Sequence, residues 1–368
     1  MISYSAVTVL LLTNRLETYP AGGREMLCRL NHDALRDIYG DMFKLFELLR
    51  PGKSGLRSFI KLYKGYIDGI SRDVIADMLQ LIGSDHVTTV FVDGSNLGEL
   101  VRVLKCECPH VKVCTFFHNV EARFFFGAFL QYKTLRALAV LMVNYLAERK
   151  AVRYSDKIVC LSKRDSQLLQ RLYGRQATHI SPMALQDRLP ATGVSPERAR
   201  HDKYALFVGG PFYANRAGIT WFVKNVAPRI TLKTVIVGRG FEDFREELEL
   251  DGKVEVIGAV ESLAEWYLGA HVVIAPIFDG SGMKTKVAEA LMFGKKIIGT
   301  PEAFSGYEDI ADVAGCICAT ADEFVAAFDN LSHAGVLPFD KELRALYESH
   351  YSYSTARSRL EEILSCNA

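Results

Sequence analysis

Residues 278–300, FDGSGMKTKVAEALMFGKKIIGT, place glycines, lysines and a glutamate around the start of a short predicted helix. We expect this helix to begin near Gly282 or Met283 and to end at Gly294, a residue type common just after helix ends. Glycines before it let the backbone approach a ligand, because no Cβ is in the way. Free amides and the partial positive charge at a helix start attract anions. The stretch therefore predicts an anion site at the amides of Gly282, Met283 and Lys284.

Charged side chains in the same stretch indicate what the anion could be. Lys284 and Lys286 flank the expected helix start, where a cation costs about a few tenths of a kcal/mol unless an anion such as phosphate offsets it. Solvated surface lysines are the alternative reading. Glu289 follows in apolar company, and a buried carboxylate needs hydroxyl or amide partners, because leaving it unpaired costs several kcal/mol. A ribose diol would supply them.

The elements that position these residues form two βαβ series, the pattern of doubly wound parallel sheets. Expected strands are residues 6–13, 87–94, 111–118 and 157–162 in the first series, and 204–210, 234–238, 254–258, 271–277 and 295–300 in the second. Between them, Asn96 is expected to cap one helix and Gly174 to end another. Ligands of such sheets bind at the carboxyl ends of the strands.

These patterns predict an α/β protein with two Rossmann-like doubly wound domains that face a cleft. The domain bounds are residues 1–185, a linker at 186–203 marked by prolines and charges, residues 204–345, and a terminal helical segment at 346–368 that crosses back to the first domain.

Composition limits the classes of protein that the chain could be. Nearly half of its 368 residues are apolar, which suits two packed cores. No apolar run reaches the roughly 18 residues of a membrane span, and the opening run is interpreted as a strand rather than a signal peptide. The eight cysteines mostly lie in strand-like apolar runs, which indicates reduced thiols in the cytoplasm. Cys106, Cys108 and His110 lie close in sequence, but without a second cysteine pair this is a weak metal motif, and we predict no metal.

Charge is divided unevenly along the chain. Residues 1–185 contain 25 Lys and Arg against 17 Asp and Glu, whereas the remainder is acidic. A basic half favours an anionic partner, although drift of surface charge is an equal alternative. No nucleic-acid partner is expected.

The order of the motifs VGG, VIVG, VEVIGAV, the stretch 278–300 and GYED resembles the carboxyl-terminal domain of GT-B glycosyltransferases. The similarity is to the retaining group called glycosyltransferase family 4, or glycosyl transferases group 1. It covers the second half of the chain, and AGGRE, FFHNVE and ERKAVRYSDKIVCLSKRD extend it loosely into the first half. It implies transfer of a sugar from a nucleotide-diphosphate sugar to a glycan or lipid-linked acceptor, with retention of configuration and without a cofactor.

The resemblance also assigns residues of the second domain. Glu289 corresponds to the second glutamate of the family's Glu-x7-Glu motif, which binds the donor ribose, but Ser281 replaces the first. Gly210 occupies the position of a diphosphate-binding arginine, and Arg216 is the nearest cationic candidate, with a surface arginine as the alternative. Lys284 and Lys286 could take over that task. These departures leave open a noncatalytic partner subunit, or an epimerase or hydrolase on the same fold.

In the first domain, Gly22 and Gly23 open a helix and resemble the loop that faces the donor phosphates. His118 ends a strand, and in similar enzymes the matching histidine lies against the donor sugar; a satisfied core histidine is the alternative. Lys286 and the helix amides would stabilise the leaving diphosphate. The sequence contains no Asp-x-Asp pair, so this stabilisation is predicted to be metal-independent.

Two segments indicate where an acceptor could bind. Residues 55–70 form a basic amphipathic helix pattern, and residues 124–146 are rich in aromatic and apolar side chains. An anionic membrane surface would suit both, which predicts a peripheral location at its inner face, whereas an ordinary core face with a solvated back is the alternative. The sequence does not specify the base, the sugar, the acceptor, the linkage or the oligomeric state.

Overall fold

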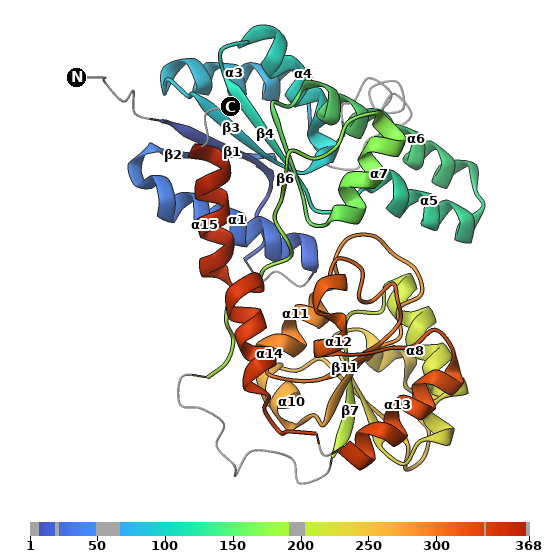
Figure 1. The fold of residues 1–368 in the computed structure, drawn as a ribbon. Helices are drawn as coiled ribbons and strands as arrows, with labels where there is room; N and C mark the ends of the chain where they lie inside the picture. Colours follow the sequence, from blue (N-terminus) through green and yellow to red (C-terminus); the bar gives the residue numbers. More distant parts are fainter. Residues whose placement is uncertain (1–6, 19–21, 49–66, 191–202, 335, 366–368) are drawn as a thin grey trace. The chain divides into compact units, whose positions relative to one another are not determined.

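The protein is described here by a computed structural model. The described residues are 7–18, 22–48, 67–190, 203–334 and 336–365. The chain divides into two compact units, Met1–Pro182 with Ala356–Ala368 and Met183–Thr355 (Figure 1). Most of the amphipathic segment 55–70 lies outside the described residues.

The first unit contains a six-stranded parallel sheet in the order β2-β1-β3-β4-β5-β6. Its strands are β1 (Val9–Asn14), β2 (Phe43–Leu48), β3 (Thr89–Asp93), β4 (Lys112–Phe117), β5 (Lys157–Cys160) and β6 (His179–Ile180). The central strands are buried apolar runs, as expected of a parallel sheet that helices cover on both faces.

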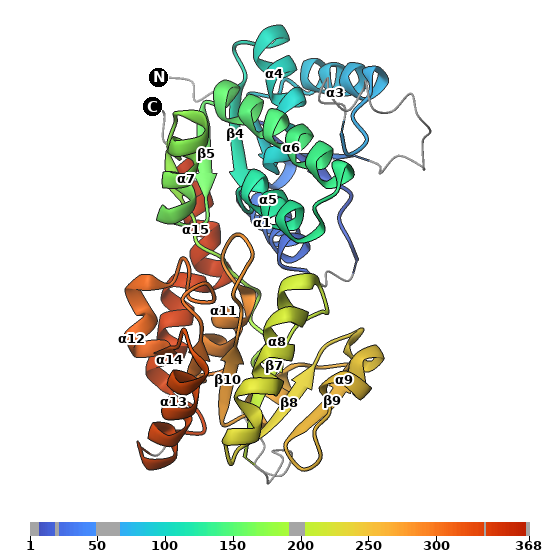
Figure 2. The ribbon, with the colours of Figure 1, turned by 90° about the vertical axis from the view of Figure 1, so that its right-hand side faces the viewer.

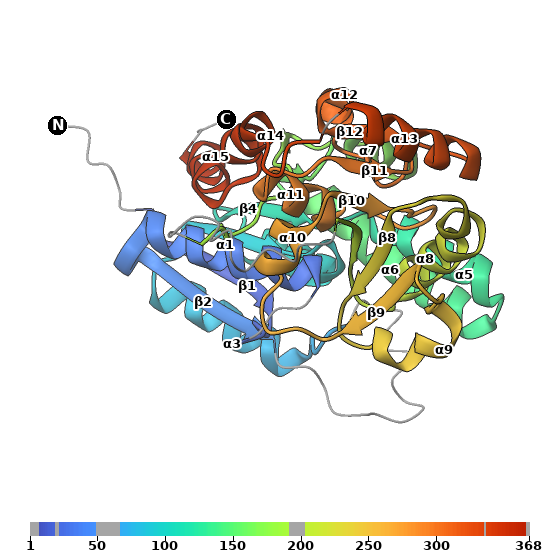
Figure 3. The same ribbon diagram turned by 90° about the horizontal axis from the view of Figure 1, so that it is seen from below.

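Helices cover both faces of this sheet. They are α1 (Gly23–Tyr39), α3 (Arg72–Ser84), α4 (Gly98–Glu107), α5 (Glu121–Tyr132), α6 (Leu135–Tyr154), α7 (Lys163–Tyr173) and α15 (Tyr353–Ser365). α1 lies on one face, and α3 and α4 pack on the other, where their apolar side chains meet those of β1, β3 and β4 (Figures 1 and 3). Near the end of α15, the Ile363 carbonyl accepts a 2.6 Å hydrogen bond from Lys157 Nζ.

The second unit repeats this design with the strand order β12-β11-β10-β7-β8-β9. Its strands are β7 (Tyr204–Val208), β8 (Lys233–Val237), β9 (Val254–Gly258), β10 (Val272–Ala275), β11 (Ile297–Gly299) and β12 (Gly315–Ile317). Its helices are α8 (Tyr213–Asn225), α9 (Arg245–Leu248), α10 (Ala264–Gly269), α11 (Thr285–Met292), α12 (Ala311–Ala314), α13 (Ala321–Ala334) and α14 (Lys341–Leu346). The order reverses between β7 and β10, so the loops that follow these two strands diverge at the carboxyl edge of the sheet.

The nine expected strands are all present, and the structure adds the edge strands β2, β6 and β12. Gly174 ends α7 with φ of +77°, as expected of a glycine at a helix end. The expectation for Asn96 is wrong: the residue before α4 is Leu97, and the Asn96 side chain instead accepts a 3.1 Å hydrogen bond from Arg24. Among the described residues, no helix is both long enough and apolar enough to cross a membrane.

Candidate active site

Lys286 is the buried cation of the second unit's candidate site, on α11 directly after the β10 loop. Lys286 is only 6% exposed, and its Nζ donates a 3.0 Å hydrogen bond to Asn215 Oδ1. Asn215, on α8 after β7, donates in turn to the Gly210 carbonyl at 2.8 Å. A Cβ at position 209 would lie 2.7 Å from Asn215 Nδ2, so any side chain there would displace the Asn215 amide from this position. The loops on both sides of the switch point thus meet at Lys286.

The surroundings of Lys286 compensate its positive charge only in part. Burial lowers its pKa to about 8, although the nearby Glu289 carboxylate acts in the opposite direction. The acceptor of its hydrogen bond, Asn215 Oδ1, is a neutral amide oxygen rather than a carboxylate. An anionic ligand at Nζ would therefore gain a charge-assisted hydrogen bond and would offset the cost of burying the ammonium group.

Glu289 lies three residues further along α11, on the same face of the helix as Lys286. It is 6% exposed, and its Oε2 accepts a 2.8 Å hydrogen bond from the Tyr267 hydroxyl. Arg188 Nη1 lies 3.8 Å from Oε1. The carboxylate has the hydroxyl partner that its burial requires.

The start of α11 differs from the prediction. The helix begins at Thr285 rather than near Gly282 or Met283, and Lys284 is its N-cap residue. The free amides of its first turn therefore belong to Thr285 and Lys286. Gly282 lies before the helix and adopts φ of +66°, which glycine tolerates best. Gly294 follows the helix end with φ of +58°, as predicted.

The other predicted donor-binding residues of this loop have different surroundings. Lys284 Nζ donates to Glu302 Oε1 at 3.0 Å and to the carbonyls of Gly282 and Ser281 at 2.9 and 3.4 Å. This lysine therefore fixes the conformation of its own loop. The Met283 side chain is 5% exposed, and its sulfur accepts a 3.3 Å hydrogen bond from a backbone amide.

Arg216 contacts residues other than Lys286 and Glu289. It lies on α8, with its side chain 45% exposed and Nη2 2.8 Å from Glu247 Oε2. Its guanidinium carbon lies 4.0 Å from the centre of the Phe244 ring. These contacts place its charge in a surface pair, which matches the alternative reading of this residue.

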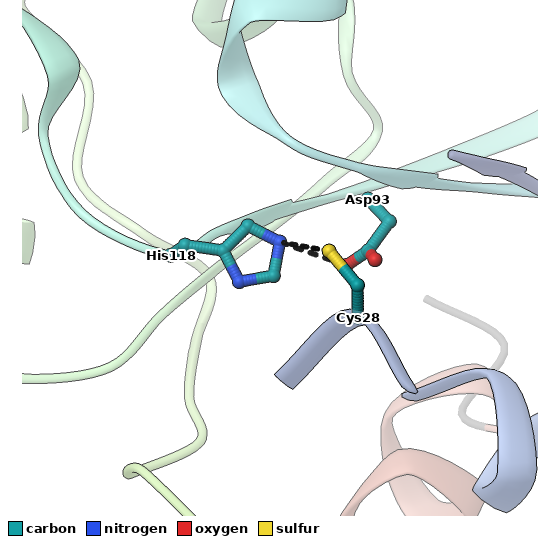
Figure 4. Close-up of side chains that lie close together, drawn as sticks. All are labelled: Cys28, Asp93 and His118. Carbon is teal, nitrogen blue, oxygen red and sulfur yellow. Dashed lines mark hydrogen bonds and ion pairs between the residues drawn. The ribbon is translucent and has the colours of Figure 1, made fainter. Parts of the chain in front are cut away.

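His118 belongs to a buried polar cluster in the first unit (Figure 4). It follows β4, and Asp93 is the last residue of the neighbouring strand β3; the distance from His118 Nε2 to Asp93 Oδ1 is 3.0 Å. Asn31 Nδ2 donates to the same carboxylate oxygen at 2.9 Å, and Thr13 donates to the other at 3.3 Å. Cys28 Sγ lies 3.6 Å from His118 Nε2.

The charge state of Asp93 fixes the orientation of the histidine. Burial alone would raise the pKa of Asp93, but the charge of His118 and hydrogen bonds from His118, Cys28 and Asn31 hold it below its usual value. An ionised carboxylate only accepts, so His118 Nε2 must carry the hydrogen. Nδ1 is buried and has no hydrogen-bond partner among the described residues. It is the ring nitrogen whose hydrogen-bonding capacity is unused in the described part of this structure.

Among the described residues, the side chains of Cys28, Asp93 and His118 bring their potential ligand atoms within 4.8 Å of one another. This is close enough for the three to hold a metal ion. Burial raises the pKa of the Cys28 thiol far above its usual value, whereas a metal ligand is a thiolate. Asp93 already accepts hydrogen bonds from its neighbours. The arrangement is better explained as a hydrogen-bonded network.

Gly22 and Gly23 begin α1 as expected, with Gly22 as the N-cap residue and Gly23 the first helical residue. The same helix carries Cys28 and Asn31 toward Asp93. Sequence reasoning missed Asp93, Asn31, Asn215 and Tyr267. Of these, Asp93 could have been found, because it ends a predicted strand and the carboxyl ends of neighbouring parallel strands meet at one edge.

The fold and part of the sequence resemble known glycosyltransferases. Residues 202–333 match the family model described as Glycosyl transferases group 1. HepE from Anabaena, solved in complex with UDP, aligns with a TM-score of 0.68 and 13% identity over 98% of this chain and 100% of that chain. Sucrose-phosphate synthase from Thermosynechococcus elongatus aligns with a TM-score of 0.72 and 14% identity over 97% and 98%. The lipopolysaccharide outer core galactosyltransferase WaaB aligns with a TM-score of 0.64 and 13% identity over 97% and 99%.

A search of curated protein sequences gives no match. The two six-stranded parallel sheets with flanking helices have the two-domain GT-B fold of these structures. The predicted α/β fold with two doubly wound parallel-sheet domains is thereby confirmed.

Proposed function

We propose that the protein is a glycosyltransferase that takes a sugar from a nucleotide-diphosphate sugar. The observation that carries this proposal is the pair of buried charges on one face of α11, Lys286 and Glu289, at the switch point of the second sheet. The match of residues 202–333 to Glycosyl transferases group 1 supports it, as does the UDP bound by HepE. UDP is therefore the first donor nucleotide to test.

The proposed roles follow from the chemistry of each group. Lys286 Nζ and the first-turn amides of α11 would bind the diphosphate and stabilise the negative charge that develops as it leaves. Glu289 would accept hydrogen bonds from the ribose hydroxyls, with the Tyr267 hydroxyl holding its other oxygen. The His118 Nδ1 atom would meet a hydroxyl of the transferred sugar, the place that the family resemblance assigns to this residue.

The finer parts of the proposal are retention of configuration, no metal or cofactor, and a glycan or lipid-linked acceptor at the inner face of a membrane. Retention rests on the resemblance to glycosyltransferase family 4. Metal independence rests on Lys286 as the resident cation and on the lack of Asp-x-Asp spacing in the sequence. WaaB, a lipopolysaccharide galactosyltransferase by its description, supports the acceptor class.

A second candidate is a noncatalytic partner subunit with the same fold. It is favoured by Ser281 in place of the family's first glutamate and by the engagement of Arg216 with Glu247. Nucleotide release from UDP-, GDP- and ADP-sugars, followed with and without acceptor extracts, separates the possibilities. Acceptor-dependent release supports transfer, and acceptor-independent release supports a hydrolase. Conversion of the donor to another nucleotide sugar without release supports an epimerase. Binding with neither release nor conversion of the donor supports the noncatalytic subunit.

A further inference from the structure

Helices α5 and α6 form a hairpin whose far end is apolar and exposed. The two helices pack against each other in the first unit and are joined by Lys133 and Thr134 (Figure 2). Of the seventeen large apolar residues that are exposed in the described chain, seven lie between positions 126 and 142. We call these seven the tip patch: Phe126, Leu130, Tyr132, Leu135, Leu138, Val140 and Met142.

The tip patch does not contribute to the core of the unit. In α5 only Glu121 and Ala122, at its start, are buried, and in α6 the first buried residue is Val143. At the turn, Leu130 is 52% exposed and Leu135 is 86% exposed. Exposed apolar residues concentrated in one short segment mark interaction sites for proteins or membranes.

The charges around the tip patch decide between these partners. No acidic residue occurs between Glu121 and Glu148, whereas Lys133 and Arg136 are exposed at the turn itself. Leucine and tyrosine side chains beside cations suit the boundary between acyl chains and anionic headgroups. No described helix qualifies as a membrane span, so the hairpin would lie on the surface.

We propose that the tip patch docks on an anionic lipid surface, with its apolar side chains in the headgroup region and Lys133 and Arg136 at lipid phosphates. This names the residues of the membrane contact in the proposed function and rests on that function only for its biological purpose. Binding to vesicles requires no donor, and binding of nucleotide requires no vesicle. The two proposals can therefore fail independently.

The test is flotation of the full-length chain with phosphatidylcholine vesicles and with vesicles that also contain phosphatidylglycerol. We expect flotation with the anionic vesicles only, and weakening at high salt. Leu130→Ser with Leu135→Ser should lower the vesicle affinity about tenfold or more. Lys133→Gln and Arg136→Gln should each lower it about fivefold. Leu337→Ser and Arg171→Gln, exposed residues elsewhere, are matched controls that should float like the parent.

Each variant is first checked by its melting temperature and circular dichroism spectrum, so that misfolding is not mistaken for lost docking. Equal flotation of the parent with neutral and anionic vesicles, or none with either, would overturn the proposal. So would unchanged flotation of the Leu130→Ser, Leu135→Ser variant. A parent that is dimeric in light scattering and becomes monomeric in this variant, without vesicle binding, would assign the tip patch to a second copy of the chain instead.

Discussion

Asp93 Oδ1 and His118 Nε2 lie 3.0 Å apart at the ends of two adjacent strands, inside the first unit. The carboxylate is fully buried and ionised, and it is held by Asn31 and Thr13 as well as by the histidine. This pair fixes the ring so that Nδ1, which has no hydrogen-bond partner among the described residues, faces away from Asp93. Asp93 is therefore a positioning residue for His118.

Replacing Asp93 by asparagine should lower kcat for sugar transfer about tenfold to a hundredfold, because the ring loses the charge that orients it. The affinity for UDP should not change, since the proposed nucleotide site belongs to the other unit. The double variant with His118→Ala should be no slower than His118→Ala alone. Steady-state kinetics check this, with the variant Asp77→Asn, at an exposed residue of α3, as control. Additive losses in the double variant would show that Asp93 does not act through His118.

Two buried lysines of the second unit should respond oppositely to removal of their charge. Lys286 donates to the amide oxygen of Asn215, whereas Lys295 donates to the carbonyls of Leu268, Ala270 and Pro338. Lys286→Met should raise the free energy of unfolding at pH 7 by about 1–3 kcal/mol, because a buried charge with little compensation is removed. Lys295→Met should lower it by about 2–4 kcal/mol, because three carbonyls lose their donor. Urea denaturation of both variants checks the signs.

The difference in the free energy of unfolding between Lys286→Met and the parent should depend on pH between pH 8 and pH 10. The pKa of Lys286 is about 8 in the folded protein, and an unfolded lysine has the ordinary value near 10.4. Between these values the unfolded parent binds more protons than the folded parent, so the parent gains stability as pH rises. The difference between variant and parent should therefore shrink from pH 8 to pH 10. A difference that is constant over this range would contradict the assignment.

Nucleotide binding should be accompanied by proton uptake near pH 8. A diphosphate beside Lys286 raises the pKa of the ammonium group, so about half a proton per site should be taken up at pH 8. Isothermal titration calorimetry of UDP in two buffers of different ionisation enthalpy measures this number. Lys286→Met should show no uptake, and uptake equal to that of the parent would assign the proton to another group.

Removal of divalent metals should impair neither UDP binding nor sugar transfer. Dialysis against EDTA should change neither the UDP affinity nor the rate of transfer, because Lys286 and the α11 amides supply the positive charge. Loss of activity that Mg²⁺ or Mn²⁺ restores would show that a metal carries this charge instead.

The strands and the doubly wound order were predictable because parallel strands are continuous apolar runs separated by helical patterns. The edge strands β2, β6 and β12 were not, since β6 and β12 are only two and three residues long and β2 is mostly half exposed. Periodicity is weak in such elements.

The candidate site was predictable only where its residues share one short segment, as Lys286 and Glu289 do. Their partners Asn215 and Tyr267 come from other elements, 71 and 22 residues away, and no local pattern connects them. The sequence pattern predicts the start of α11 too early, because it includes Gly282 and Met283 in the helix. In the structure Gly282 precedes the helix and has a left-handed backbone conformation.

The central claim is that a nucleoside diphosphate binds at Lys286 and Glu289, and its most direct test is a calorimetric titration of UDP, GDP and ADP. The parent should bind at least one of them. Glu289→Ala and Lys286→Met should each lower its affinity about tenfold to a hundredfold, as expected when a charged hydrogen-bond partner is lost. Tyr204→Phe, which removes a hydroxyl elsewhere in the unit, should bind like the parent. Equal affinity of the parent and both site variants for every nucleotide would contradict the claim.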